Sequence, residues 1–126
     1  MADHHFQCRV YYEDTDLSGL VYHANYFKFV ERARSEWVRS LGIDQAAMRA
    51  DGRVFVVARI EADFRAPARY DDLLDVVTTV EETRPARLVL RQIVSREGHA
   101  LFSARVTVAL IGPGGRPERI PERLRA

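Results

Sequence analysis

Apolar and polar residues alternate near the start of the chain. Along 6–12, every second residue is apolar or aromatic: Phe6, Cys8, Val10 and Tyr12. A period of two is typical of a half-buried β-strand. The next stretch, 13–19, contains three acidic residues, a serine and a glycine, and this composition predicts a loop.

After this loop the hydrophobic period becomes that of an amphipathic helix. Its apolar stripe consists of Tyr26, Val30, Ala33, Trp37 and Leu41, with Phe29 beside it. The helix is expected to begin near 23–25, where Asn25 is suited to cap the first turn, and to end at Gly42. A shorter helix is expected over 44–50.

The remainder of the chain predicts four strands, over 54–65, 73–83, 86–96 and 101–111. The last three are joined by connections too short for a parallel crossover, so they must run antiparallel. With the first strand they form a five-stranded antiparallel sheet wrapped around one long helix, an α+β arrangement. The edges of such a sheet need cover, and pairing with a second copy would provide it. We therefore expect a homo-oligomer.

The length of 126 residues is that of one domain, which can bury a core without a metal or a disulfide. We expect a single domain over 1–126, with 112–126 as a flexible or partly ordered tail. Nineteen basic and eighteen acidic residues leave a net charge of +1, which argues against coating nucleic acid or an anionic membrane. Lys28 is the only lysine; the excess of arginine fits a biased codon pool, although arginine also suits phosphate.

The cysteine content and the hydropathy indicate a compartment. Cys8 is the only cysteine, so an intramolecular disulfide is excluded and a reducing environment is expected. No apolar run approaches the roughly 20 residues that span a bilayer, and the first residues lack a basic-then-apolar signal pattern. We expect a cytoplasmic protein without a transmembrane segment.

The acidic loop is the candidate site, because a helix start follows it closely. Free N–H groups there can stabilise an oxyanion, and a carboxylate facing them provides a base or nucleophile for acyl transfer to water. Asp16 is preferred over Glu13 and Asp14 because it lies nearest Gly19 and the helix start. His23 could orient water, relay a proton or cap the helix. The alternative is a solvated acidic turn.

The sequence does not favour a metal site, a nucleotide-binding site or a serine-hydrolase site. His4, His5 and His99 are dispersed and do not have the spacing of metal ligands. The motifs of phosphate loops, dinucleotide-binding folds and serine-hydrolase elbows are absent. Most nucleotide-dependent and serine-hydrolase functions are thereby excluded.

The segment 10–26, VYYEDTDLSGLVYHANY, with Phe29 and the run ERAR at 31–34, resembles the signature of the 4-hydroxybenzoyl-CoA thioesterase family. It is most similar to the branch of Tol-Pal-associated acyl-CoA thioesterases. The resemblance continues through 64–72 and the last strands. It implies a hotdog fold, dimers that often pair into tetramers, active sites between subunits, an acyl-CoA substrate, and no metal or redox cofactor.

The resemblance also implies roles for single residues. Asp16 would act as general base or nucleophile on the thioester carbonyl. The backbone N–H at His23 would polarise that carbonyl, and the His23 side chain would be a second polar catalytic group. Tyr12 would lie beside the catalytic Asp.

Coenzyme A carries phosphates, and in the family the groups that bind them lie on a surface strand and near the chain end. Arg84, Arg87 and Arg116 occupy roughly such places. Each is also typical of an exposed strand end or tail. We predict that they bind the phosphates of the substrate.

The sequence thus favours an acyl-CoA thioesterase that releases a carboxylic acid and free CoA. One alternative is a non-catalytic component that binds acyl-CoA or acyl-carrier protein in a cell-envelope (Tol-Pal) complex. Another is a hydratase on the same fold, although the motif here begins with a carboxylate rather than with a histidine.

Overall fold

The computed structural model describes residues 3–125. The main elements, in chain order, are β1 (His4–Arg9), α1 (Asn25–Ser40), α2 (Gln45–Ala50), β2 (Val54–Phe64), β3 (Leu73–Thr83), β4 (Arg87–Arg96) and β5 (His99–Ile111). Short 3₁₀ turns are formed by η1 (Tyr12–Asp14), η2 (Pro113–Gly115) and η3 (Glu122–Leu124). The predicted strands and helices are confirmed to within a few residues at their ends.

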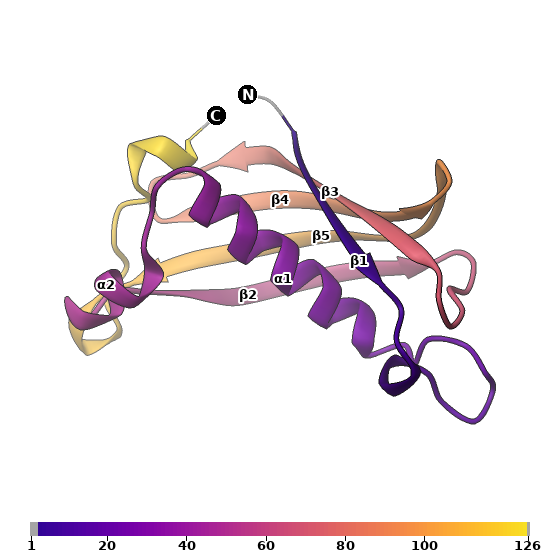
Figure 1. Cartoon of the computed structure of the whole chain (residues 1–126). Coiled ribbons are helices and arrows are strands. Elements are labelled where there is room, and N and C mark those ends of the chain that lie inside the picture. The colour runs from indigo at the N-terminus through magenta and orange to yellow at the C-terminus, as the bar shows by residue number, and fades with distance from the viewer. Residues whose placement is uncertain (1–2, 126) are drawn as a thin grey trace.

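The five strands form one antiparallel sheet in the order β1-β3-β4-β5-β2. The last three strands are neighbours, as their short connections predict. Helix α1 lies across the curved inner face of this sheet (Figure 1). The α+β prediction of a sheet wrapped around one long helix is confirmed.

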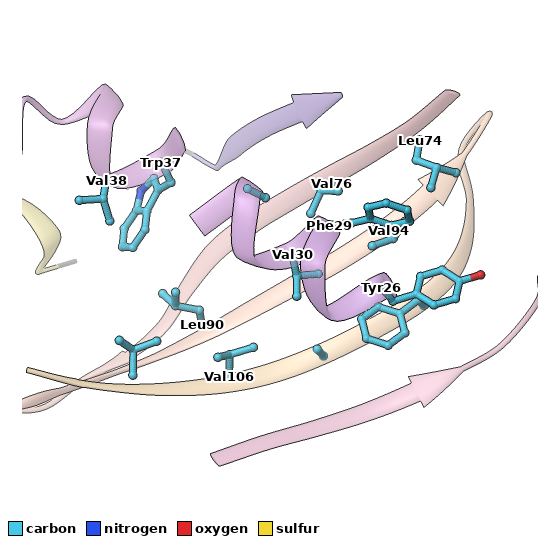
Figure 2. Close-up of a cluster of buried hydrophobic side chains, with 14 of the residues drawn as sticks. Tyr26, Phe29, Val30, Trp37, Val38, Leu74, Val76, Leu90, Val94 and Val106 are labelled. Carbon is cyan, nitrogen blue, oxygen red and sulfur yellow. The ribbon is translucent and has the colours of Figure 1, made fainter. Parts of the chain in front are cut away.

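The core lies between α1 and the sheet. The predicted apolar stripe is buried at Tyr26, Phe29, Val30, Ala33 and Trp37. Figure 2 shows this stripe facing side chains of the central strands, among them Leu74, Val76, Leu90, Val94 and Val106. Burial of this stripe sets the position of α1, because exposing it would cost the transfer free energy of several large side chains.

The start of α1 differs from the prediction. Ala24 occupies the N-cap position, and no side chain within residues 3–125 caps the helix. Asn25 is instead the first helical residue, and its buried side chain donates to the carbonyl of Asp14. The prediction that Asn25 caps the first turn is therefore wrong, because its amide is used to hold the preceding loop.

The segment after β5 folds back onto the domain. Ile120 and Leu124 are buried in the core, and the Ile120 N–H donates to the Pro85 carbonyl at 2.8 Å. Arg123 Nη1 donates to the Leu41 carbonyl at 3.2 Å. These contacts tie the segment to the β3–β4 turn and to the end of α1.

Candidate active site

Asp14 organises the loop between β1 and α1. Its buried carboxylate accepts a hydrogen bond from the Tyr11 N–H at 2.8 Å, which closes the turn η1. Its carbonyl accepts from the Tyr22 N–H at 2.9 Å and from Asn25 Nδ2 at 2.8 Å. Since both groups of Asp14 are engaged inside the fold, this residue is structural.

Asp16, in contrast, presents its carboxylate to solvent at the surface of the loop. The loop turns back within four residues: the Asp16 N–H donates to the Leu20 carbonyl, and the Gly19 N–H donates to the Asp16 carbonyl. Gly19 has a φ of +79°, which favours glycine. This turn holds Asp16 at a defined position although its side chain is exposed.

Ser18 controls the protonation of Asp16. Both its hydroxyl and its N–H donate to Asp16 Oδ1, the N–H at 2.9 Å. These hydrogen bonds lower the pKa of Asp16, because they stabilise the charged form of the carboxylate. Asp16 is therefore ionised at neutral pH and can accept a proton or attack a carbonyl.

Asp16 lies in the wall of a surface hollow of about 410 Å³. The loop contributes Asp16, Ser18 and Leu20, and the end of β2 with the following turn contributes 64–67. His23, two residues before α1, and Tyr26, in its first turn, complete the wall. The turn is fixed against the loop by two hydrogen bonds of Ala68: its carbonyl accepts from the Val21 N–H, and its N–H donates to the Tyr26 hydroxyl. Three segments that are distant in the sequence thus meet around one carboxylate.

The start of α1 borders the same hollow. The His23 ring contacts the Phe64 ring edge-on, with centroids 6.1 Å apart. Within residues 3–125, the backbone N–H groups of His23 and Ala24 have no acceptor, whereas that of Asn25 donates to the Tyr22 carbonyl. Free N–H groups at the positive end of a 16-residue helix can stabilise a polarised carbonyl oxygen.

The structure brings Asp16 and His23 together, but it separates Tyr12 from them. The Tyr12 side chain is 85% exposed and does not line the hollow. Its carbonyl has a local role, since it accepts from the Thr15 hydroxyl at 2.8 Å.

The three predicted phosphate-binding arginines lie near one another at the far end of the sheet. Arg84 and Arg87 flank the β3–β4 turn, where the Arg84 N–H donates to the Arg87 carbonyl at 2.9 Å. Arg116 follows η2, and its carbonyl accepts from the Gly112 N–H. The loop with Asp16 is at the opposite end of the sheet (Figure 1). One chain therefore does not bring these arginines to the hollow.

Ser18, Tyr26 and Phe64 also line the hollow, although the sequence alone did not predict them as site residues. A serine two residues after an aspartate was a detectable signal, because this spacing is typical of a local turn that bonds the carboxylate. Tyr26 and Phe64 were interpreted as parts of a helix stripe and a strand. Nothing in their local pattern indicates that they meet.

Residues 18–103 match the sequence model of the thioesterase superfamily. The chain belongs to this superfamily. The predictions of a hotdog fold and of a thioesterase are thereby confirmed.

Individual relatives agree with this assignment. The acyl-CoA thioester hydrolase YbgC of Escherichia coli is 44% identical over 106 residues, which are 83% of this chain and 79% of that protein. The acyl-CoA thioesterase YbgC of Haemophilus influenzae is 40% identical over 123 residues, or 96% of this chain and 90% of that protein. A probable thioesterase from Bartonella henselae superposes with a TM-score of 0.90 at 40% identity, over 95% of this chain and all of that one.

None of the helices within residues 3–125 combines the length and the apolar character needed to cross a membrane. No group of three or more His, Cys, Asp or Glu side chains in this range is arranged to hold a metal ion.

Proposed function

We propose that this protein hydrolyses acyl-CoA thioesters to a carboxylic acid and free CoA, without a cofactor. The observation that carries the proposal is the hollow shared by the Asp16 carboxylate and the start of α1 in a chain of the thioesterase superfamily. The names of the relatives from Escherichia coli and Haemophilus influenzae support acyl-CoA as the thioester.

Asp16 supplies the proton acceptor or the nucleophile. In the first route it takes a proton from water, the water oxygen bonds to the carbonyl carbon, and the C–S bond breaks to release the CoA thiolate. In the second route the carboxylate itself attacks, expels the thiolate and leaves a mixed anhydride, which water then hydrolyses. Both routes need an ionised Asp16, and the hydrogen bonds from Ser18 favour that form.

The start of α1 stabilises the negative charge that develops on the thioester oxygen. The free N–H of His23 provides a hydrogen bond donor, and the helix dipole adds partial positive charge. The His23 side chain lies in the wall of the same hollow, where it can orient water or relay a proton.

The position of Tyr12 supports a catalytic role less than the positions of Asp16 and His23 do, because Tyr12 is exposed to solvent in the single chain.

We further propose that two copies pair through β2, as the first step to a dimer or tetramer. This edge strand exposes four large apolar side chains: Val56, Val57, Ile60 and Phe64. Such an edge is a template for pairing with another strand. Phe64 also lines the hollow, so the partner copy would border each active site.

Antiparallel pairing of β2 gives the distant arginines a role. Val54 at the start of β2 pairs with Ile111, and Arg87 pairs with Ala109, so the start of β2 lies at the arginine end of the sheet. An antiparallel partner would place this end beside Phe64 of the first copy. Arg84, Arg87 and Arg116 of one copy would then bind the CoA phosphates at the active site of the other.

The test is thiol release from a panel of short, long and aromatic acyl-CoAs. Asp16→Asn keeps an acceptor for Ser18 but removes the base, and we expect kcat/KM to fall by about 10²-fold or more. Glu13→Gln, an exposed change in the same loop, is the matched control and should stay near the wild-type rate. Normal turnover by Asp16→Asn on every accepted substrate would refute the role of Asp16.

A cytoplasmic location and a link to the Tol-Pal system stay predictions.

The thiol-release assay separates the thioesterase from the non-catalytic alternative, because a protein that only binds acyl-CoA would release no thiol.

A further inference from the structure

A second concavity lies at the other end of α1 from the hollow. It has a volume of about 210 Å³ and lies between the second half of α1, the first residues of β2, strand β4 and the turn η3. Figure 2 shows Trp37, Val38 and Leu90 at this end of the core, away from Tyr26.

The walls of this cavity are mostly hydrocarbon. They include Trp37, Phe55, Leu88, Leu90, Val108 and Leu124. Such a lining fits an aliphatic or aromatic segment of a ligand.

Arg34 adds a positive charge to this apolar cavity. Its side chain is half-buried, and burial lowers its pKa. Nη1 donates to Oε1 of the fully buried Gln92 at 3.0 Å, a neutral partner. In the described part of the chain Arg34 forms no ion pair. Guanidinium groups withdrawn from water are normally paired with an anion, so Arg34 has capacity for one.

Among the residues that the structure describes, Glu31 is the one acidic residue in the lining. It is exposed, and its carboxylate accepts a weak hydrogen bond of 3.4 Å from the Ser35 hydroxyl. Water and salt screen its repulsion of an incoming anion. Glu31 offsets part of the charge of Arg34, but because it is exposed to water it leaves the half-buried guanidinium able to bind a further anion.

We propose that this cavity binds a carboxylate on a short apolar body, with Arg34 as the anchor. The carboxylate has two possible sources. It is either the free acid, or the far end of an acyl group whose thioester lies at Asp16 of a second copy. The second source rests on the proposed function and on pairing through β2, because Val56 and Val57 of that edge also line the cavity.

A direct binding test does not depend on catalysis. Trp37 lines the cavity and is the only tryptophan in the chain, so its fluorescence reports occupancy. Hexanoate should change the fluorescence saturably, and 1-hexanol, of the same length without the charge, should bind at least about tenfold more weakly. Equal binding of the two probes would overturn the proposal, and this comparison needs only the wild-type protein.

Variants then locate the anchor. Arg34→Met should weaken hexanoate binding about tenfold or more, and Arg34→Lys should recover part of it. Arg39→Met is the matched control, since Arg39 is exposed on the same helix, pairs with Glu36 and does not line this cavity. Full hexanoate affinity in folded Arg34→Met, checked by circular dichroism, would overturn the role of Arg34.

A kinetic comparison separates the sources. If the acyl group supplies the carboxylate, the wild-type protein should prefer adipyl-CoA to hexanoyl-CoA by kcat/KM, and Arg34→Met should lose this preference. In the alternative outcome, the wild-type protein and Arg34→Met show the same ratio of kcat/KM for adipyl-CoA to kcat/KM for hexanoyl-CoA. If hexanoate still binds through Arg34 in that case, the cavity is assigned to the free acid. Absence of hydrolysis of any acyl-CoA, with hexanoate binding intact, would refute the proposed function but not this site.

Discussion

Asn25 holds Asp14 by a hydrogen bond from its side-chain amide to the Asp14 carbonyl, at 2.8 Å. Both residues are buried, one at the start of α1 and the other in the loop before it. Asp16 is only two residues further along the chain. This bond therefore sets the position of the candidate base relative to the helix start.

We predict that Asn25→Ala lowers both stability and activity. It removes one donor from the buried Asp14 carbonyl, which should reduce the free energy of unfolding by about 1–3 kcal/mol. The loop should also lose its fixed position, so kcat should fall under conditions where the variant is fully folded. Urea unfolding and thiol release measure the two effects. A variant as stable and active as Glu13→Gln would contradict this function of Asn25.

We predict that Ser18→Ala moves the acid limb of the pH–rate profile to higher pH. The Ser18 hydroxyl lowers the pKa of Asp16, so its loss raises that pKa toward the usual value for a carboxyl. The active carboxylate is then protonated at a higher pH than in the wild-type protein. The measurement is kcat/KM between about pH 3 and pH 7, the region of the usual aspartate pKa.

A threonine at position 18 keeps the hydroxyl and serves as the control for this shift. Ser18→Thr should follow the wild-type profile on the acid side. An acid limb that stays in place in Ser18→Ala would mean that another group controls the rate.

We predict that Gln92→Leu destabilises the fold by about 1–3 kcal/mol. Gln92 is fully buried, and its Nε2 donates to the Val30 carbonyl and to the Thr78 hydroxyl, each at 2.9 Å. Leucine leaves these acceptors, and the donor of Arg34, without this partner.

Thr78→Val tests this explanation in a double-mutant cycle measured by urea unfolding. In the double variant with Gln92→Leu, valine removes the Thr78 hydroxyl that Gln92→Leu leaves without its donor. The double variant should therefore lose less stability than the sum of the two single changes. Strict additivity would show that the Gln92–Thr78 bond contributes little.

We predict that the Asp72–Arg96 pair makes stability depend on pH in the acid range. Burial alone would raise the pKa of Asp72, but the hydrogen bonds from the Arg69 N–H and from Arg96 outweigh it and lower the pKa. A lowered folded-state pKa means that the contribution is complete above the unfolded value of about 3.9 and is lost as pH falls through the folded value.

Asp72→Asn should therefore reduce the free energy of unfolding by about 1–2 kcal/mol at pH 7 and by less at pH 3. Asp71→Asn is the matched control, because Asp71 is exposed and asparagine also accepts its φ of +71°. A loss in Asp72→Asn that is equal at both pH values would rule out the ion pair as its cause.

The elements of this fold follow closely from local patterns. The apolar stripe from Tyr26 to Trp37 predicts α1, and the period of two in 54–65 and 101–111 predicts β2 and β5. The prediction of α1 succeeds because the helix buries one stripe, and a buried stripe imposes its period on the sequence. The antiparallel order of the last three strands follows from their short connections.

The candidate site was predicted only in part. The spacing of Asp16, Gly19 and His23 indicates a loop beside a helix start. In the structure the side chains of Asp16 and His23 line one hollow. The choice between Asp14 and Asp16 rested on spacing alone, whereas the structure shows one carboxylate buried in a turn and the other exposed. Local sequence does not encode that difference, because burial depends on what packs against the loop.

The sequence by itself determined the secondary structure, the antiparallel meander and the acidic loop before a helix, since these depend on neighbours within a few residues. Tertiary structure alone decided that Phe64 from β2 faces His23, that Gln92 supports Arg34 at a second cavity, and that the arginines lie opposite Asp16. Contacts of this kind join residues far apart in the chain. They arise from how the sheet curves around α1, which no local period specifies.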